Sequence, residues 1–198
     1  MIRVIGMGPG SMKYVTPEAV ERIKEADVVL AFGRIAETAL LIRPDIQQVN
    51  RVDELLPLMD FTKEVAVLAS GDPCFYGIVE TLQRKKVEIE EVIPGLSSVQ
   101  YLMSKLKMSW QDAALSSFHG REGSLEAIKS HQRSIVLTDS KYTPNEISQL
   151  LWQAGIRGSI TAGFDLSYPT ELIVKKSIGE EIQGPSILAV VVIENEMA

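Results

Sequence analysis

The chain has 198 residues, of which 45% are hydrophobic and 23% are charged. This balance is typical of a globular protein rather than a disordered one, and at ~150 residues per domain the length allows one domain or two small ones. Lysine and arginine total 20, aspartate and glutamate total 26, and the formal net charge is −6. Because a negative field does not attract phosphate backbones, we expect no nucleic acid partner.

Cysteine content and hydropathy predict a cytoplasmic protein. The one cysteine, Cys74, cannot form an internal disulfide. The longest apolar run near either end, 187–193, is far shorter than the ~20 residues of a membrane helix, and no secretory signal opens the chain. The two histidines, His119 and His131, lack ligand-like spacing. We therefore expect neither membrane contact nor a protein-bound metal.

In chain order, the first half alternates between apolar runs and helical patterns. A strand at 2–5 enters a glycine-rich loop, after which Thr16 and Pro17 begin a short helix. Further strands are expected at 28–31, 65–69 and 88–93, and the continuous apolar run at 65–69 is typical of a parallel sheet buried on both faces. Two more helices are predicted by apolar residues at helical spacing: Phe75, Ile78, Val79 and Leu82 in the first, and Val99, Leu102, Met103 and Leu106 in the second.

The second half has a different pattern. The alternation pauses between Lys107 and Arg121, then resumes with a strand at 134–138 and a helix at 144–154. Strand-like stretches follow without long helices between them, at 159–164, 170–175 and 186–193. We predict an α/β fold of two lobes, 1–110 and 115–198, with a mostly parallel N-terminal sheet, a mixed C-terminal sheet and a cleft between the lobes.

Two loops follow strands in the first lobe and carry glycine and proline. The Gly-Met-Gly-Pro-Gly loop at 6–10 is not a dinucleotide-binding fingerprint, because position 11 is serine and Pro9 interrupts the amide donors. The Ser-Gly-Asp-Pro loop at 70–73 offers Asp72 as an acceptor for a ribose hydroxyl or a positively charged ligand. Each loop, taken alone, also fits a plain turn.

Two further loops complete the set. The Ile-Pro-Gly-Leu-Ser-Ser loop at 93–98 places serines where they either cap the next helix or open onto the same sheet edge. The Phe-His-Gly-Arg segment at 118–121 lies at the seam between the lobes, and its arginine suits bidentate recognition of carboxylates.

The order of these motifs resembles that of the S-adenosylmethionine-dependent tetrapyrrole methylases, over nearly the whole chain. Within this family, the segments Asp-Pro-Cys-Phe-Tyr-Gly at 72–77 and Trp-Gln-Asp-Ala at 110–113 are most similar to the branch that methylates C5 of cobalt-precorrin-7. The resemblance implies a methyltransferase of corrin synthesis that uses S-adenosylmethionine and releases S-adenosylhomocysteine. It also implies a homodimer, with methylation at C15 left to a separate enzyme.

The resemblance also assigns site residues. It implies that the donor contacts Gly71, Asp72, Pro73, Tyr76, Ser97, Ser98, Leu137, Thr138 and Ala162. It implies that the tetrapyrrole contacts Pro9, His119, Gly120 and Arg121. Because the substrate carries many carboxylates, we predict a local basic patch formed by Arg34, Arg121 and Lys141. No side-chain nucleophile is assigned, because the electron-rich macrocycle itself attacks the methyl group.

Alternatives remain open at this level. The nearest is another enzyme of the same superfamily: one that methylates a different corrin carbon, a diphthine synthase or an rRNA ribose methyltransferase, although the acidic composition disfavours RNA. A module that binds the donor without transferring methyl is a second, and an oxidoreductase is a third.

Overall fold

The computed structural model describes residues 1–118, 125–186 and 188–196, and the chain divides into two compact units, Met1–Ser98 and Val99–Ala198. The lobes expected from sequence, 1–110 and 115–198, differ from this division by the helix that begins at Ser98. The side chain of Leu102 on that helix packs against Gly163 of the second unit. The extent of independently folding domains and the cleft expected between them stay predictions.

The first unit is built on a parallel sheet with the strand order β3-β2-β4-β1-β5. Its elements are β1 (Ile2–Gly6), η1 (Met12–Tyr14), α1 (Pro17–Glu25), β2 (Val28–Phe32), α2 (Ile35–Ala39), β3 (Gln47–Val49), α3 (Val52–Leu55), η2 (Leu56–Leu58), β4 (Val65–Ala69), α4 (Ile78–Arg84) and β5 (Glu91–Ile93). The expected parallel pairing is confirmed. The interior strand β4 is buried at all five positions, which explains its continuous apolar sequence.

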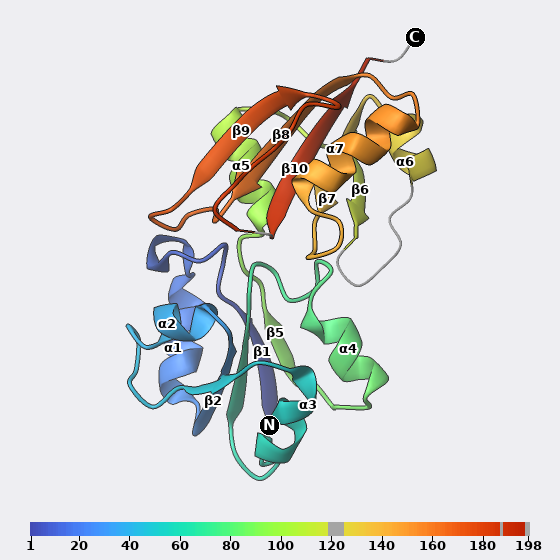
Figure 1. Cartoon of the computed structure of the whole chain (residues 1–198). Coiled ribbons are helices and arrows are strands. Elements are labelled where there is room, and N and C mark those ends of the chain that lie inside the picture. Colours follow the sequence, from blue (N-terminus) through green and yellow to red (C-terminus); the bar gives the residue numbers. More distant parts are fainter. Residues whose placement is uncertain (119–124, 187, 197–198) are drawn as a thin grey trace. The chain divides into compact units, whose positions relative to one another are not determined.

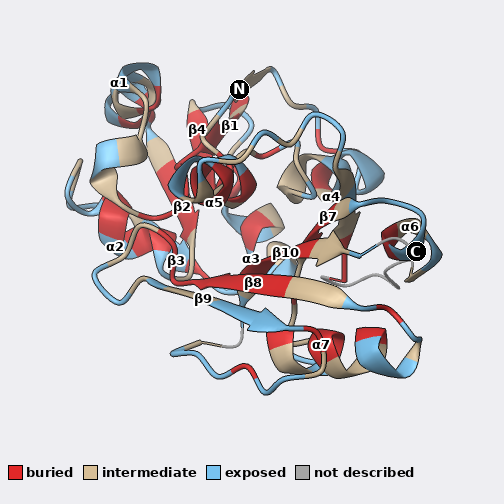
Figure 2. Ribbon diagram, turned by 90° about the horizontal axis from the view of Figure 1, so that it is seen from above, coloured by how far each residue is buried: buried red, intermediate tan, exposed pale blue. Residues whose placement is uncertain are grey.

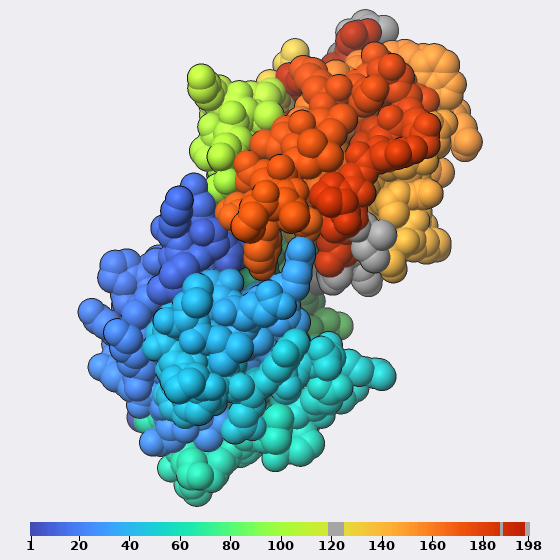
Figure 3. All heavy atoms as spheres, turned by 60° about the vertical axis from the view of Figure 1, so that its left-hand side comes forward, coloured from blue at the N-terminus to red at the C-terminus, as the bar shows by residue number. Residues whose placement is uncertain are grey.

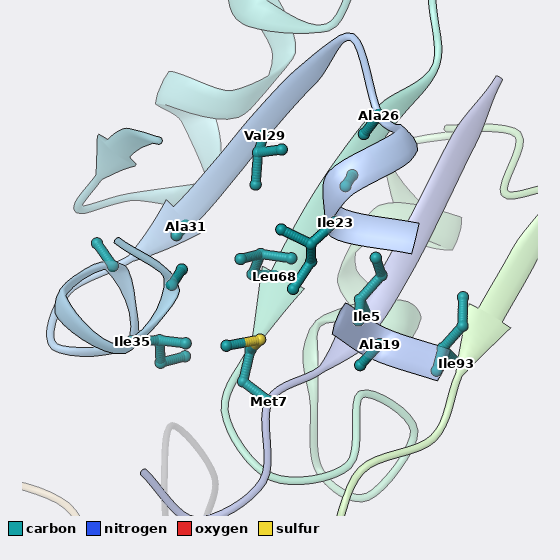
Figure 4. Packing of buried hydrophobic residues seen from close by; sticks show 13 residues of the cluster. Ile5, Met7, Ala19, Ile23, Ala26, Val29, Ala31, Ile35, Leu68 and Ile93 are labelled. Carbon is teal, nitrogen blue, oxygen red and sulfur yellow. The ribbon is translucent and has the colours of Figure 1, made fainter. Parts of the chain in front are cut away.

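Helices cover both faces of this sheet (Figure 1). On one face, α1 and α2 pack against Ile5, Val29 and Leu68 (Figure 4). On the other, Leu55 of α3 and Leu82 of α4 pack against alternate residues of the same strands. The helix start predicted at Thr16 is confirmed, because its hydroxyl accepts a hydrogen bond from the Ala19 N–H at 3.1 Å.

The second unit contains a mixed sheet with the order β6-β7-β10-β8-β9. Its elements are α5 (Ser98–Leu106), β6 (Ala114–Ser117), α6 (Leu125–Lys129), β7 (Arg133–Leu137), α7 (Pro144–Gln153), β8 (Gly158–Phe164), β9 (Leu172–Ser177) and β10 (Ala189–Asn195). Strands β6 and β7 are parallel, whereas β10 is antiparallel to both β7 and β8. Strands β6, β7 and β8 therefore end at the same edge. Figure 2 shows the contrast between the buried β8 and the exposed edge strand β9.

Two expectations about the elements were wrong. Strand β6 lies within the stretch where the alternation pauses, because its small residues give a weak apolar pattern and pairing with β7 decides its conformation. Phe75 lies outside α4, which begins at Ile78. The preceding residues form a turn, in which the Phe75 N–H donates to the Asp72 carbonyl at 3.2 Å.

Candidate functional site

The connections of the parallel sheet reverse direction between β1 and β4. The chain leaves β1 toward β2 on one side of the sheet, and it leaves β4 toward β5 on the other. Neighbouring strands whose connections diverge leave a crevice outside their carboxyl ends, where α/β proteins bind ligands. The loops at 6–10 and 70–73 follow these two strands, so both predicted loops lie at the switch point.

Three loops interlock at this edge through their glycine backbones. A Cβ atom on Gly6 would lie 2.5 Å from the Gly95 nitrogen and 2.8 Å from the Gly71 carbonyl oxygen. A Cβ atom on Gly95 would fall within 3 Å of the backbones of Gly6 and Gly71. No side chain larger than hydrogen fits at either position without a shift of the main chain. The loops predicted from sequence at 6–10, 70–73 and 93–98 are therefore in direct contact.

The first two loops are also joined by hydrogen bonds. The Gly71 N–H donates to the Gly8 carbonyl at 2.8 Å, and Gly8 returns a longer bond to the Gly71 carbonyl at 3.4 Å. Both glycines have a positive φ, +71° for Gly8 and +63° for Gly71, a conformation that other residues rarely adopt. Pro9, which the resemblance assigns to the tetrapyrrole, is buried directly after this bridge.

The loop after β4 presents a carboxylate and an aromatic ring. Asp72 is half-buried, and its Oδ1 accepts a hydrogen bond from the Cys74 N–H at 2.8 Å, which orients the carboxylate within its own turn. Among the described residues no cation forms an ion pair with Asp72. Tyr76 has a φ of +49°, is 36% exposed and contacts the Phe75 ring edge-on, with the ring centroids 4.9 Å apart. Non-glycine residues with positive φ are uncommon and cluster at functional sites.

The serines after β5 adjoin the same loop. Ser97 is 6% exposed, and its Cα would lie 3.5 Å from a Cβ atom on Gly71, so the two residues are neighbours. Ser98 is half-buried and is the first residue of α5. The structure therefore brings Gly71, Ser97 and Ser98 together, while the assignment of each to the donor stays a prediction.

In the second unit, the predicted residues divide between a strand end and the core. Leu137 ends β7, and the next residue, Thr138, is 3% exposed. The Thr138 hydroxyl accepts a hydrogen bond from the Ala189 N–H at 2.7 Å and donates one to the Ala189 carbonyl at 3.0 Å. Ala162 is fully buried within β8, where it belongs to the core cluster of the unit. The Thr138 hydroxyl is therefore engaged in holding β10.

The substrate-side residues are described only in part. His119, Gly120 and Arg121 lie outside the described residues, which resume at Leu125. The residue before them, Phe118, donates its N–H to the Leu137 carbonyl at 2.9 Å, at the edge where β6 and β7 end. In the predicted basic patch, Arg34 is exposed beyond the end of β2, and Lys141 is exposed beyond the end of β7.

Sequence reasoning did not identify a polar cluster near the end of β8. The Tyr101 hydroxyl donates to Glu171 Oε2 at 2.5 Å, and the Ser167 N–H donates to the same oxygen at 2.7 Å. Burial and the hydrogen bond to Glu171 raise the pKa of Tyr101 to about 12. Burial opposes ionisation of Glu171, but bonds from Tyr101, the Ser167 N–H and Lys105 outweigh it and lower its pKa. Nothing in the local spacing of these residues indicates that they meet.

The chemistry of this edge is compatible with a sulfonium nucleoside, and the assignment of that ligand to it stays a prediction. Such a ligand carries a cationic centre, ribose hydroxyls and an adenine ring, which match a carboxylate, polar backbone groups and an aromatic side chain. Asp72 and Tyr76 follow β4, and the glycine backbones come from the three loops at this edge. In the described part of the chain, no group of three or more histidine, cysteine, aspartate or glutamate residues is placed to hold a metal ion. Among the described helices none is long and apolar enough to cross a membrane.

Comparison with known proteins identifies the family of the chain. The model of the Tetrapyrrole (Corrin/Porphyrin) Methylases matches residues 1–181. A probable cobalt-precorrin-7 C(5)-methyltransferase of Methanocaldococcus jannaschii is 33% identical, over 99% of both chains.

Two solved structures show the same fold. The precorrin-6Y methylase from Archaeoglobus fulgidus has a TM-score of 0.77 at 22% identity, covering 99% of this chain and 98% of that one. The uroporphyrin-III C-methyltransferase of Thermus thermophilus, solved with S-adenosylhomocysteine, has a TM-score of 0.76 at 24% identity and covers 97% and 96% of the two chains. The resemblance inferred from the ordered loops and the α/β fold class with a parallel and a mixed sheet are thus confirmed, and the chain belongs to the tetrapyrrole (corrin/porphyrin) methylases.

Proposed function

We propose that this chain transfers a methyl group from S-adenosylmethionine to C5 of cobalt-precorrin-7, or of the corresponding precorrin-6Y-type intermediate. Membership of the methylase family accounts for the reaction class and the donor. The choice of substrate and ring carbon is supported by the relative that matches over 99% of the chain and is named for this reaction. The observation that carries the proposal is the interlocked edge of three glycine loops at the switch point of the first sheet.

Catalysis by this chain depends on orientation. S-adenosylmethionine, when bound, supplies an electrophilic methyl group to the electron-rich ring carbon. Holding two reacting groups in line contributes as much as ~7–11 kcal/mol to lowering a barrier. The Gly8–Gly71 hydrogen bonds and the contacts of Gly95 make the edge rigid, which is the requirement for such positioning. Asp72 and Tyr76 then orient the donor from the loop after β4.

The substrate side requires cations, because the macrocycle carries several carboxylates and the chain has a net charge of −6. Arg34 and Lys141 are exposed at the strand ends of their units and can meet carboxylates there. Arg121 is proposed for the same role from the sequence motif. A cytoplasmic homodimer, with methylation at C15 carried out by a separate enzyme, completes the proposal.

A single-turnover assay tests this function. The protein is mixed with methyl-labelled S-adenosylmethionine and cobalt-precorrin-7, and the product is examined by NMR for label at C5. Label at another carbon would assign a different corrin methylation. Absence of any labelled corrinoid, together with saturable binding of S-adenosylhomocysteine, would instead indicate a donor-binding module. Methylation of an rRNA, or diphthine synthase activity, in parallel reactions would move the chain to another branch of the superfamily.

A further inference from the structure

The glycine-rich loop at 6–10 is held by helix α2 as well as by its neighbouring loops. Met7, at the start of the loop, is 1% exposed and packs in the same core cluster as Ile35, Ala36 and Ala39 of α2 (Figure 4). From the same helix, the Thr38 hydroxyl donates a hydrogen bond of 2.7 Å to the carbonyl of Gly10, at the end of the loop. Helix α2 therefore contacts both ends of the segment that contains Pro9.

The two ends of the loop are fixed in different ways. At the start, the Gly8–Gly71 pair and the bond from the Met7 N–H to the Ala69 carbonyl, 2.9 Å long, join it to the β4 edge. Pro9 has no N–H and cannot donate a bond of its own. Gly10 has a φ of +143°, a backbone conformation that an L-residue rarely adopts. The Thr38 hydroxyl meets the Gly10 carbonyl.

The packing around residue 38 would be satisfied by an apolar side chain, so it does not explain the hydroxyl of Thr38. Thr38 is 8% exposed on a helix whose other buried residues are apolar. The outer side of this part of the chain lies on the surface, where Leu40 and Leu41 are 49% and 75% exposed (Figure 3, light blue). Valine has nearly the same shape as threonine and fills the same space without a polar group to satisfy. What threonine adds here is the hydrogen bond to Gly10.

We propose that Thr38 is a positioning residue that sets the shape of the 6–10 loop and thereby the placement of Pro9 against the substrate. The proposal rests on the proposed function for the identity of the substrate, but the loop anchor itself is a property of the first unit. Thr38 acts through Gly10 and does not itself contact the reacting atoms. Its loss should therefore affect the tetrapyrrole more than the methyl donor.

The test compares T38V, T38S and the wild type. We expect T38V to raise the KM for cobalt-precorrin-7 by about three- to tenfold, the equivalent of one neutral hydrogen bond. The Kd for S-adenosylhomocysteine should change less than twofold, and T38S should restore the wild-type KM. A change that merely destabilised the protein would reduce the active fraction without moving KM. If T38V does not fold, T38A is measured by the same criteria.

A control for the loss of a buried hydroxyl lies in the second unit, where the Ser148 hydroxyl also accepts a hydrogen bond from the Gly179 N–H at 2.9 Å. Ser148 is fully buried, and its hydroxyl donates to the Glu180 carbonyl at 3.1 Å. S148A should leave the KM for the tetrapyrrole unchanged. An unaltered KM in T38V, no rescue by T38S, or an equal rise in S148A would overturn the proposal.

Hydrogen exchange separates this proposal from the proposed function. We expect amides in a peptide spanning 6–14 to exchange about three- to tenfold faster in T38V than in the wild type, and at the wild-type rate in S148A. This measurement does not require enzymatic activity. If the wild-type protein fails to methylate cobalt-precorrin-7, the proposed function is refuted, but the effect of Thr38 on the 6–10 loop can still be measured. Unchanged exchange in T38V would refute the anchor itself.

Discussion

The two units both carry candidate residues at strand ends, but they hold those ends by different means. In the first unit, backbone packs on backbone, and the contacts of Gly6, Gly71 and Gly95 leave no room for a Cβ atom at Gly6 or Gly95. In the second unit, side chains hold the backbone, as in the two hydrogen bonds between Thr138 and Ala189. Steric interlocking tolerates no enlargement, whereas a side-chain hydrogen bond can be removed at a limited cost. The comparison predicts abrupt losses at the interlocked glycines of the first unit and graded losses at the Thr138 bonds of the second.

The largest effect is expected for Gly95→Ala. The added methyl group would meet the backbone of Gly6 at 2.8 Å and that of Gly71 at a shorter distance, and main chain cannot yield as a flexible side chain does. We expect about 3 kcal/mol of destabilisation in chemical denaturation and loss of S-adenosylhomocysteine binding in calorimetry. The control is Gly33→Ala, where a Cβ atom meets nothing within 4 Å and only the positive φ of +46° opposes it. It should cost about 1 kcal/mol. Equal losses in the two variants would refute the interlocking.

The next effect is on ligand affinity. Asp72→Asn keeps an oxygen that can accept the Cys74 N–H but removes the charge, whereas Asp72→Ala removes both. We expect Asp72→Ala to weaken donor binding about 10- to 100-fold, as for a hydrogen bond to a charged group. Calorimetry with both S-adenosylmethionine and S-adenosylhomocysteine sharpens the assignment. A loss for both ligands indicates a group that both carry, a ribose hydroxyl or the α-ammonium, and a loss for S-adenosylmethionine alone indicates the sulfonium. Unchanged dissociation constants would remove Asp72 from the site.

A smaller and graded effect is expected at the edge of the second sheet. Thr138→Val leaves the Ala189 N–H without the hydroxyl that accepts it at 2.7 Å, so we expect about 1 to 2 kcal/mol of destabilisation. Thr138→Ser retains the hydroxyl and should recover most of that loss. Thermal or chemical denaturation followed by circular dichroism measures both variants. If the serine variant is no more stable than the valine variant, the hydroxyl is not what holds β10.

The smallest effect concerns Tyr101, whose pKa is raised to about 12 by burial and by its bond to Glu171. The folded state keeps the phenol proton to higher pH than the unfolded state, where tyrosine titrates at about pH 10. The contribution of the protonated phenol to the free energy of unfolding is complete below about pH 10 and is lost as the pH rises toward 12. We expect Tyr101→Phe to cost about 1 kcal/mol at neutral pH and the difference from wild type to shrink over that alkaline range. A difference that stays constant with pH would contradict this assignment.

Much of the fold followed from local sequence. The continuous run of β4 predicted a strand buried on both faces, and Thr16 with Pro17 predicted the start of α1. Four short elements could not be predicted in this way. Strands β3 and β6 and helices α2 and α6 span three to five residues each, too few for a helical period, and none of them has a continuous apolar run like that of β4. Their conformation depends on the partners against which they pair.

The candidate site was also predicted only in part from local sequence. By itself, the sequence determined which loops carry glycine, proline and acid, and it determined their order along the chain, because residue type and spacing are local properties. Only the tertiary structure decided that β4 lies between β2 and β1, that Gly95 packs on Gly6 and Gly71, and that Thr38 reaches Gly10. Thr38 and Gly10 are 28 positions apart. Contacts between distant residues arise from the order in which strands pair, which no local periodicity encodes.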